Sequence, residues 1–300
     1  MYTILGATGH IGSVITRALL QKGEKVRVAG RNAARLQPLV DLGAEAVVGD
    51  QGNAEALTRA LTGARAAFLM VPPSMTSPDY RAEQEQYSTA LAAAAQKSGL
   101  QYAVHLSSVG AHAPSGTGPI AGLNRGEKML DAVDRLNVLH LRPAYFLENH
   151  LAAIGMIQTM GIYGGALRAD MRFPQIATRD IAAYAAERLL KLDFNGKQTQ
   201  ELLGERDVTM NEAAAAIGVA IRKPELRYAQ FPYEQVEQVL IQMGIPPKSA
   251  AYMIEMFHGF NDGLTAPVEP RSAANTTPTS VETFAKEVFA PAYLGQAVGA

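Results

Sequence analysis

A glycine-rich turn near the start of the chain has the residue types and spacing that bind phosphate groups. Gly6, Gly9 and Gly12 stand three residues apart, between an aliphatic run at 2–5 and a helical pattern at 11–21. Gly6 permits a tight turn, Gly9 leaves the backbone open to phosphates, and Gly12 lets the helix pack closely on the strand. A dinucleotide pyrophosphate would meet backbone N–H groups and the positive end of the helix dipole here. The pattern therefore predicts an NAD(P)-binding turn.

The end of the second predicted strand carries a cation where a carboxylate is common. An acidic residue at this place binds the ribose 2′-hydroxyl of NAD, whereas this chain has Gly30-Arg31-Asn32. Arg31 could pair with a 2′-phosphate and stack on adenine, which favours NADP(H) and makes NAD(H) the weaker candidate. The alternative is that Arg31 is a solvated residue that only precedes a helix.

Two further strand ends supply candidates for the same crevice. Asp50 ends the third predicted strand, and its carboxylate could accept a hydrogen bond from the adenine amino group. The alternative is that Asp50 caps the helix that begins at Ala54. Val71, Pro72 and Pro73 end the fourth strand. Because prolines cannot extend a strand ladder, they should turn the chain beside the cofactor ribose.

Alternating short apolar runs and longer helical patterns position these residues. The predicted strands are 2–5, 25–29, 44–48, 66–71, 102–106 and 138–141, and the helices between them are 11–21, 33–42, 54–61, 80–97 and 126–136. Such alternation predicts an α/β Rossmann fold, a doubly wound parallel sheet with helices on both faces.

After about residue 150 this alternation breaks. We expect residues 1–155 to form the NAD(P)-binding domain, with part of 173–205 returning to the sheet, and 156–300 to form mainly a smaller α+β substrate lobe. That lobe should contain helices at 178–192, 232–244 and 247–259, a loop at 266–278 and a last helix from near Thr279.

Composition excludes several classes of function. Hydrophobic residues make up 48% of the chain and charged residues 18%, with a net charge of −1, so nothing favours a nucleic-acid partner. No cysteine is present, which removes disulfides and thiolate chemistry and suits a reducing compartment. We find no signal peptide or apolar run long enough to span a membrane and expect a cytoplasmic protein without a metal site.

Six motifs together carry a resemblance to a known family. GATGHIG, GR, VVGD, LSSVGA, RGEKMLD and LRPAYFLEN, in this order and spacing, resemble the NmrA-like branch of the atypical short-chain dehydrogenases over nearly the whole chain. Within that branch the sequence is most similar to NADPH-dependent quinone reductases and triphenylmethane-dye reductases. The resemblance implies a Rossmann domain, a small C-terminal lobe and a cleft between them.

The resemblance also implies roles for residues after the fifth strand. Ser107 and Ser108 follow that strand, and the family's lysine maps onto Lys128, where it would reach the nicotinamide ribose. Ordinary short-chain dehydrogenases place a proton-donating Tyr four residues before this Lys, but position 124 is Asn. The general acid of the usual ketone reduction is therefore missing, which leaves a solvent-protonated hydride acceptor or no catalysis.

Two other residues are candidate proton donors. Tyr145 follows Pro143, and His112 lies in the loop after Ser108. For each, the favoured alternative is a residue that packs in the loop or lines the cleft. Lys128 and Tyr145 are the candidate catalytic residues.

Apolar and polar residues after the sixth strand complete the predicted site. The resemblance puts Pro143 against the nicotinamide and Phe146 and Asn149 near the substrate. Aromatic residues at helical spacing could line a pocket mouth or simply belong to the core. The predicted substrate-binding residues are Tyr145, Phe146, Asn149, Phe231 and Phe257.

These observations lead to two functional hypotheses. The first is an NAD(P)H-dependent oxidoreductase that passes hydride to a flat, apolar, aromatic acceptor such as a quinone, acting as a monomer or homodimer. The second is a non-catalytic NAD(P)-binding redox sensor that acts through a regulatory protein partner. The predicted cofactor-binding residues are Gly6, Thr8, Gly9, His10, Ile11, Gly12, Arg31, Asp50, Gln51, Val71, Pro72, Pro73, Ser107, Ser108, Lys128, Pro143 and Phe146.

Overall fold

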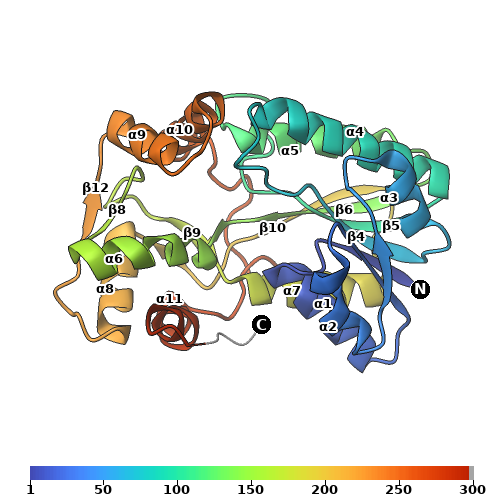
Figure 1. The fold of residues 1–300 in the computed structure, drawn as a ribbon, viewed down its shortest axis with the longest axis horizontal. Helices are drawn as coiled ribbons and strands as arrows, with labels where there is room; N and C mark the ends of the chain where they lie inside the picture. The colour runs from blue at the N-terminus through green and yellow to red at the C-terminus, as the bar shows by residue number, and fades with distance from the viewer. Residues whose placement is uncertain (297–300) are drawn as a thin grey trace.

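A seven-stranded parallel sheet forms the larger half of the protein (Figure 1). The structure is a computed structural model that describes residues 1–296. The strands lie in the order β10-β6-β5-β4-β1-β2-β3, and every neighbouring pair is parallel. Their bounds are β1 Tyr2–Leu5, β2 Val26–Gly30, β3 Glu45–Val48, β4 Ala66–Met70, β5 Tyr102–Leu106, β6 Asn137–Pro143 and β10 Lys197–Leu202.

Helices cover both faces of this sheet, so the predicted Rossmann fold is confirmed. On one face lie α1 (His10–Gln21), α2 (Ala33–Val40) and α7 (Thr178–Lys191), and on the other α3 (Ala54–Leu61), α4 (Tyr80–Ser98) and α5 (Pro119–Asp131). Apolar side chains of the helices and strands form one core on each face. A parallel sheet whose strand order reverses at its middle, with crossover helices on both faces, is the doubly wound arrangement.

One predicted helix was wrong in its position. The pattern at 126–136 predicted a helix there, but α5 runs from Pro119 to Asp131. Pro119 fits the first helical position, and Gly118 precedes it with a φ of +52°, a conformation that glycine adopts most easily. The other predicted strands and helices lie within two residues of the observed ends.

The smaller half of the protein, at the left of Figure 1, packs around two short sheets. β7 (Tyr145–Phe146), β9 (Phe173–Ile176) and β11 (Asp207–Val208) form one sheet, and β8 (Tyr163–Gly165) pairs with β12 (Tyr228–Gln230). Its helical segments are η1 Leu147–Ala153, α6 Ile154–Met160, α8 Met210–Ala220, α9 Tyr233–Gln242, α10 Pro247–Asn261, α11 Val281–Phe284, the π-helical η2 Ala285–Phe289 and α12 Ala290–Tyr293.

Buried carboxylates hold the segment after α10 against the rest of the chain. Glu201, at the end of β10, accepts hydrogen bonds from the backbone N–H groups of Val268 and Glu269, both at 3.0 Å. Asp180, in the first turn of α7, accepts from the backbone N–H of Thr279 at 3.0 Å and from its hydroxyl at 2.7 Å. The segment therefore crosses from one lobe to the other at fixed points.

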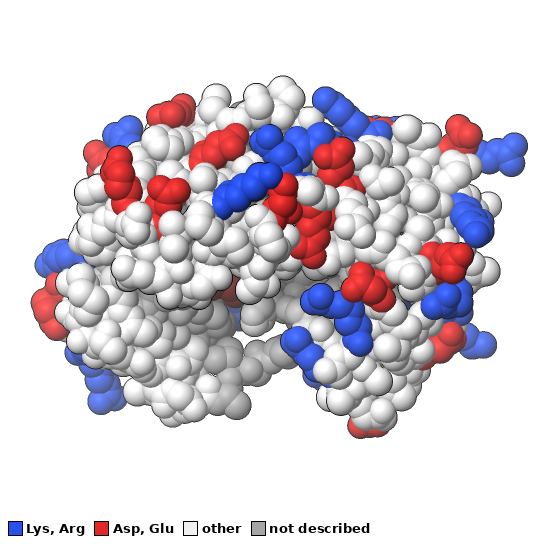
Figure 2. Space-filling model, turned by 45° about the horizontal axis from the view of Figure 1, so that its top comes forward, with Lys and Arg blue, Asp and Glu red and all other residues white. Residues whose placement is uncertain are grey.

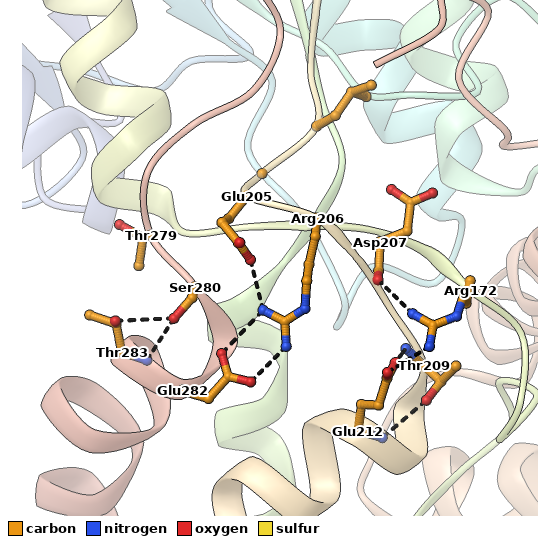
Figure 3. Close-up of polar contacts among 12 residues, drawn as sticks. Arg172, Glu205, Arg206, Asp207, Thr209, Glu212, Thr279, Ser280, Glu282 and Thr283 are labelled. Atoms are coloured by element: carbon orange, nitrogen blue, oxygen red, sulfur yellow. Dashed lines mark hydrogen bonds and ion pairs between the residues drawn. The ribbon is translucent and has the colours of Figure 1, made fainter. Parts of the chain in front are cut away.

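Exposed ion pairs add further contacts near α8 and α11 (Figure 3). Arg206 lies between Glu205 and Glu282, at 2.7 and 2.6 Å, and Arg172 pairs with Glu212 at 2.7 Å. Each exposed pair contributes little free energy. They tie the segments before β9 and β11 to α8 and α11, two helices that also lie side by side.

The surface shows no large field of one sign on the face drawn in Figure 2. Lys and Arg side chains there alternate with Asp and Glu. None of the helices in residues 1–296 has the length and apolar character needed to cross a membrane.

A buried histidine lies at the centre of the smaller lobe. His150 contacts the Tyr163 hydroxyl through Nδ1, and its Nε2 lies 2.8 Å from Oε1 of Gln175. Gln175 in turn donates to the carbonyl of Val208 at 3.2 Å. Burial lowers the pKa of His150 to about 4, so the ring is neutral at pH 7.

Stability should consequently fall in mild acid. The unfolded chain binds a proton at His150 below about pH 6.5, whereas the folded chain does so only near pH 4, so the stabilisation is complete above pH 6.5 and is lost as the pH falls towards 4. The loss amounts to up to about 3 kcal/mol at about 1.4 kcal/mol per pKa unit. Thermal melts from pH 7 to 4.5 should show a falling Tm, with a shallower fall in His150→Gln. A flat Tm in the unmutated chain would contradict this assignment.

Candidate cofactor and acceptor site

The glycine turn after β1 leaves a helix N-terminus free to bind an anion. Gly6 has a φ of +63°, and α1 begins at His10 without a side-chain cap or an acidic residue in its first turn. A Cβ at Gly12 would lie 2.3 Å from the carbonyl oxygen of Gly6, whereas one at Gly9 would meet only that oxygen, at 3.3 Å. Gly12 is therefore required for packing, and Gly9 leaves space in front of the first-turn N–H groups.

A cavity of about 450 Å³ opens beside this turn, where strand order reverses between β1 and β4. In an open α/β sheet the carboxyl ends of the strands at this point form the ligand crevice. Its lining includes residues that the sequence did not predict: Asn32, Arg35, Met70 and Tyr87. The predicted residues that line it are Gly6, Thr8, Gly9, Arg31, Gln51, Pro72 and Pro73.

A hydrogen-bonded carboxylate holds one wall of the cavity. Glu83 of α4 accepts from the Ser74 hydroxyl at 2.7 Å and from the Tyr87 hydroxyl at 2.8 Å. Hydrogen bonds from Ser77 and Ser74, together with the nearby charge of Arg31, lower the pKa of Glu83. The wall that faces Arg31 therefore carries the negative charge of Glu83, and this carboxylate lies close to the Arg31 guanidinium.

At the third strand end, the structure favours Gln51 over Asp50. The Asp50 carboxylate is exposed and accepts the backbone N–H of Gly52 at 2.6 Å, outside the main cavity. It does not cap α3 either, because the Asn53 side chain does so. Gln51 lines the cavity, and its buried Oε1 has no hydrogen-bond partner within residues 1–296. A donor such as an adenine amino group would satisfy that oxygen.

Backbone hydrogen bonds bring the loops after β5 and β6 together. The backbone N–H of Ser107 donates to the carbonyl of Leu141 at 2.7 Å, and the backbone N–H of Val109 donates to the carbonyl of Pro143 at 3.0 Å. Ser107, Ser108 and Pro143 therefore meet at the carboxyl edge of the sheet.

Three buried polar atoms around this loop lack a hydrogen-bond partner in the described part of the chain. They are Ser107 Oγ, Thr117 Oγ1 and Asn124 Oδ1. Asn124 uses its Nδ2 to donate to the carbonyl of Ala111 at 2.7 Å. Unsatisfied buried groups of this kind fit the polar half of a nicotinamide nucleotide.

Lys128 is not brought to this site. It is exposed and lies nine residues after Pro119, about 13 Å along α5 at about 1.5 Å per residue. A helix that follows a parallel strand starts at the carboxyl edge and runs away from it, so this position is far from the glycine turn. Its neighbour Glu127 is buried and pairs with Arg142 at 2.5 Å.

The predicted substrate residues are dispersed. Tyr145 and Phe146 are consecutive on β7, so their side chains point in opposite directions. Phe146 packs against the core beneath the main sheet. Tyr145 packs edge-to-face on Phe173 and Phe260, with ring centroids 5.6 and 6.1 Å apart, and burial raises its pKa.

The other three predicted substrate residues differ in their surroundings. Asn149 is exposed on η1, the Phe231 ring packs against Gly164 of β8, and Phe257 is half-buried on α10. His10 and His112, the loop histidines, are exposed.

A second cavity of about 230 Å³ lies next to the loop that carries Ser108, and its lining is mostly apolar but includes the charged residues Arg172 and Asp207. Val109, Phe173 and Phe260 line it together with Thr265 from the segment after α10. Phe260 was not among the predicted residues, although it stands three residues after Phe257 on the same helix. Nothing in the sequence connects Phe173 with Phe260, because they are far apart along the chain.

Comparisons with known proteins agree with this architecture. The model of the NmrA-like family matches residues 2–285. The chain is 29% identical over 259 residues to an NAD(P)H azoreductase of Xenophilus azovorans, covering 86% of each chain. It is 28% identical to a (4-alkanoyl-5-oxo-2,5-dihydrofuran-3-yl)methyl phosphate reductase of Streptomyces griseus, covering 84% and 85%. The fold matches that of an NADPH-dependent quinone oxidoreductase from Escherichia coli crystallised with NADPH, with a TM-score of 0.81, 23% identity and coverage of 96% and 100%.

Substitutions in the glycine turn should separate binding from folding. Gly9→Val places a branched side chain in front of the first-turn N–H groups, so NADPH binding measured by calorimetry should fall at least about 100-fold while Tm changes little. Gly12→Ala is the contrasting variant: its Cβ would overlap the Gly6 carbonyl, so it should lower Tm by several degrees. Native NADPH affinity in Gly9→Val would remove the turn from the binding site.

Proposed function

Because this chain belongs to the NmrA-like family, as its motifs predicted, we propose that it acts as an NAD(P)H-dependent reductase. The observation that carries the proposal is the 450 Å³ cavity at the switch point of the sheet, with glycines at its phosphate end and the unpartnered Gln51 oxygen inside. Such a constellation suits a dinucleotide with a pyrophosphate on the helix N-terminus.

Within this function we propose a preference for NADP(H) over NAD(H). Arg31 and Arg35 both line the cavity beside Asn32, and no acidic residue stands at the end of β2. Two guanidinium groups supply paired donors for a 2′-phosphate. The Glu83 carboxylate of α4 lies close enough to offset part of this positive charge, so the preference for NADP(H) over NAD(H) should be moderate.

We propose that the acceptor is a flat, conjugated, apolar molecule such as a quinone or an azo dye. The 230 Å³ cavity is smaller than typical drug-sized pockets of about 300–1,000 Å³, which suits one or two rings. Val109 forms part of its wall and follows Ser108, so a ring held there would adjoin the proposed nicotinamide end. Two relatives are named as an azoreductase and a quinone oxidoreductase, and azo compounds and quinones are both conjugated acceptors. The Streptomyces griseus relative is named for a dihydrofuranone that carries a phosphate.

In this proposal the protein contributes position and desolvation. Bound NADPH supplies a hydride from C4 of its nicotinamide. Ser107, Ser108 and Pro143 orient that end, and the Tyr145, Phe173 and Phe260 cluster excludes water from the acceptor. A conjugated acceptor delocalises the added charge, so a Tyr acid at the place of Asn124 is not required.

Exchanging the charge at Arg31 should change cofactor choice. The unmutated protein should bind NADPH at least about tenfold more tightly than NADH, and Arg31→Asp should reverse that order, because a carboxylate repels the 2′-phosphate. Titration with both cofactors measures this. Arg35→Asp is the matched variant, and it should weaken NADPH binding in the same direction. If NADPH and NADH bind with equal affinity before and after both substitutions, this end of the cavity does not bind the 2′-phosphate.

Two further variants test the proposed absence of a tyrosine acid. Turnover of NADPH with a panel of quinones and azo dyes should change less than about threefold in Tyr145→Phe, because a lost general acid costs about 10²–10⁴-fold. Lys128→Ala should also leave the rate nearly unchanged, since Lys128 is exposed on the distal part of α5. A Tyr145→Phe rate in the general-acid range would contradict the mechanism. Tight NADPH binding without any acceptor-dependent oxidation of NADPH would instead favour the alternative hypothesis of a non-catalytic redox sensor.

A further inference from the structure

The second cavity, next to Val109, has one charged end. Apolar side chains such as Val109, Phe173 and Phe260 form most of its wall. The charged residues that line it within positions 1–296 are Arg172, which precedes β9, and Asp207, which begins β11. These two residues are neighbours, because Arg172 Nη1 donates to the backbone carbonyl of Asp207 at 3.1 Å. A ligand that matches this lining has an apolar body and one charged group.

The charge of Asp207 is already neutralised by a firmly held cation. Arg271 contacts the Asp207 carboxylate through Nη2, and the same guanidinium donates to the carbonyls of Gly204 at 2.6 Å and Leu203 at 3.1 Å. Figure 3 shows the Asp207 carboxylate directed away from Arg172, whose contact is with the backbone oxygen. Asp207 therefore has its counter-charge fixed in place and offers little attraction to a cationic ligand.

Arg172 is held less firmly than Arg271. Its Nη2 donates to Oε1 of Glu212 at 2.7 Å, but the two side chains are 60% and 37% exposed, and an exposed pair contributes little free energy. Nε of Arg172 makes no hydrogen bond within residues 1–296, so the guanidinium retains donors for a ligand. Glu212 also accepts the backbone N–H of Thr209 at 2.8 Å, within the cap of α8. Arg172 can therefore bind a second anion while Glu212 stays in place.

We propose that Arg172 selects acceptors that carry an oxyanion substituent, such as a sulfonate, carboxylate or phosphate, on their conjugated ring. This inference rests on the proposed reductase function. The apolar ring would lie against Phe173 and Phe260, and the anionic oxygens would accept hydrogen bonds from the guanidinium at the mouth of the cavity. The substituent takes no part in hydride transfer. Arg172 is thus a residue that determines specificity, and it leaves the chemistry to the ring and the cofactor.

A matched pair of probes separates the effect of charge from that of shape. Naphthalene sulfonate and the neutral naphthalene sulfonamide share a ring and are nearly equal in size, but they differ by one charge. Calorimetry on the protein loaded with NADP⁺ should show the sulfonate bound at least about threefold more tightly, because an ion pair at an exposed mouth is modest. Added salt should reduce this preference, since it screens exposed charges. Equal affinities for the two probes, or no measurable binding of the sulfonate, would overturn the inference.

Substitutions of Arg172 test whether this side chain is the source of the preference. Arg172→Gln should abolish it, and Arg172→Lys should restore part of it, because Lys keeps the charge but not the paired donors of a guanidinium. Arg168→Gln is the matched control, since Arg168 is 50% exposed, pairs with Asp170 at 3.4 Å and does not line the cavity. The control should keep the full ratio of sulfonate to sulfonamide affinity. An equal loss of this ratio in Arg168→Gln would remove Arg172 from the argument.

Glu212→Gln distinguishes ligand recognition from a merely structural role of the ion pair. A glutamine there can still accept the Thr209 N–H, so α8 keeps its cap, but the charge that competes for Arg172 is removed. The ratio of sulfonate to sulfonamide affinity should therefore rise at least about twofold, in the direction opposite to Arg172→Gln. A fall of the ratio in both variants, or no change in either, would mean that the pair only holds the lobe together.

Turnover measurements keep this inference apart from the proposed function. With naphthoquinone and naphthoquinone sulfonate as acceptors, the ratio of kcat/KM for the sulfonate to that for the parent quinone should fall at least about threefold in Arg172→Gln. Turnover of both quinones with an unchanged ratio would overturn the inference and leave the reductase function standing. Arg172-dependent binding of naphthalene sulfonate without turnover of either quinone would count against the proposed function alone.

Discussion

The close approach of α1 to the turn after β1 is the contact on which the rest of the site depends. Because Gly12 has no Cβ, α1 can lie against the Gly6 carbonyl, where a methyl group would be 2.3 Å away. This contact aims the first turn of α1 at the switch point between β1 and β4. The cavity proposed for the pyrophosphate and the adenine lies at this edge of the sheet, and the second cavity lies beside Val109, which follows β5.

Much of the Rossmann half could be predicted because its rules are local. Strands such as β1 and β5 are short apolar runs between turn residues, and their ends were predicted to the residue. The glycine turn was likewise predicted from spacing alone. At α5 the apolar pattern was misleading, since the sheet-facing side of that helix carries buried polar residues, and Pro119 was the better signal for its start.

The second half of the chain was less predictable because its order comes from contacts between distant segments. β10 reads Lys-Gln-Thr-Gln-Glu-Leu and lacks the apolar signature of a central strand, since it lies at the sheet edge. Glu201 and Asp180 are anchors for backbone more than 60 residues away, and no local pattern shows that. Asp180 stands in the first turn of α7, but its carboxylate accepts hydrogen bonds from Thr279 and not from the N–H groups of that helix. For the same reason the Phe173 and Phe260 pairing could not be read from the sequence.

The polar face of α5 gives a physical reason for the missing Tyr and displaced Lys. Asn124, Glu127 and Asp131 are spaced three and four residues apart, so they lie on one side of the helix and face the sheet. They contact in turn the Ala111 carbonyl, Arg142 and His140. A helix whose inner face is committed to these partners has no place there for a Tyr-x-x-x-Lys pair, and Lys128 is turned to solvent. The buried histidines on the α5 side of the sheet therefore come from the strands beneath that helix, His105 from β5 and His140 from β6.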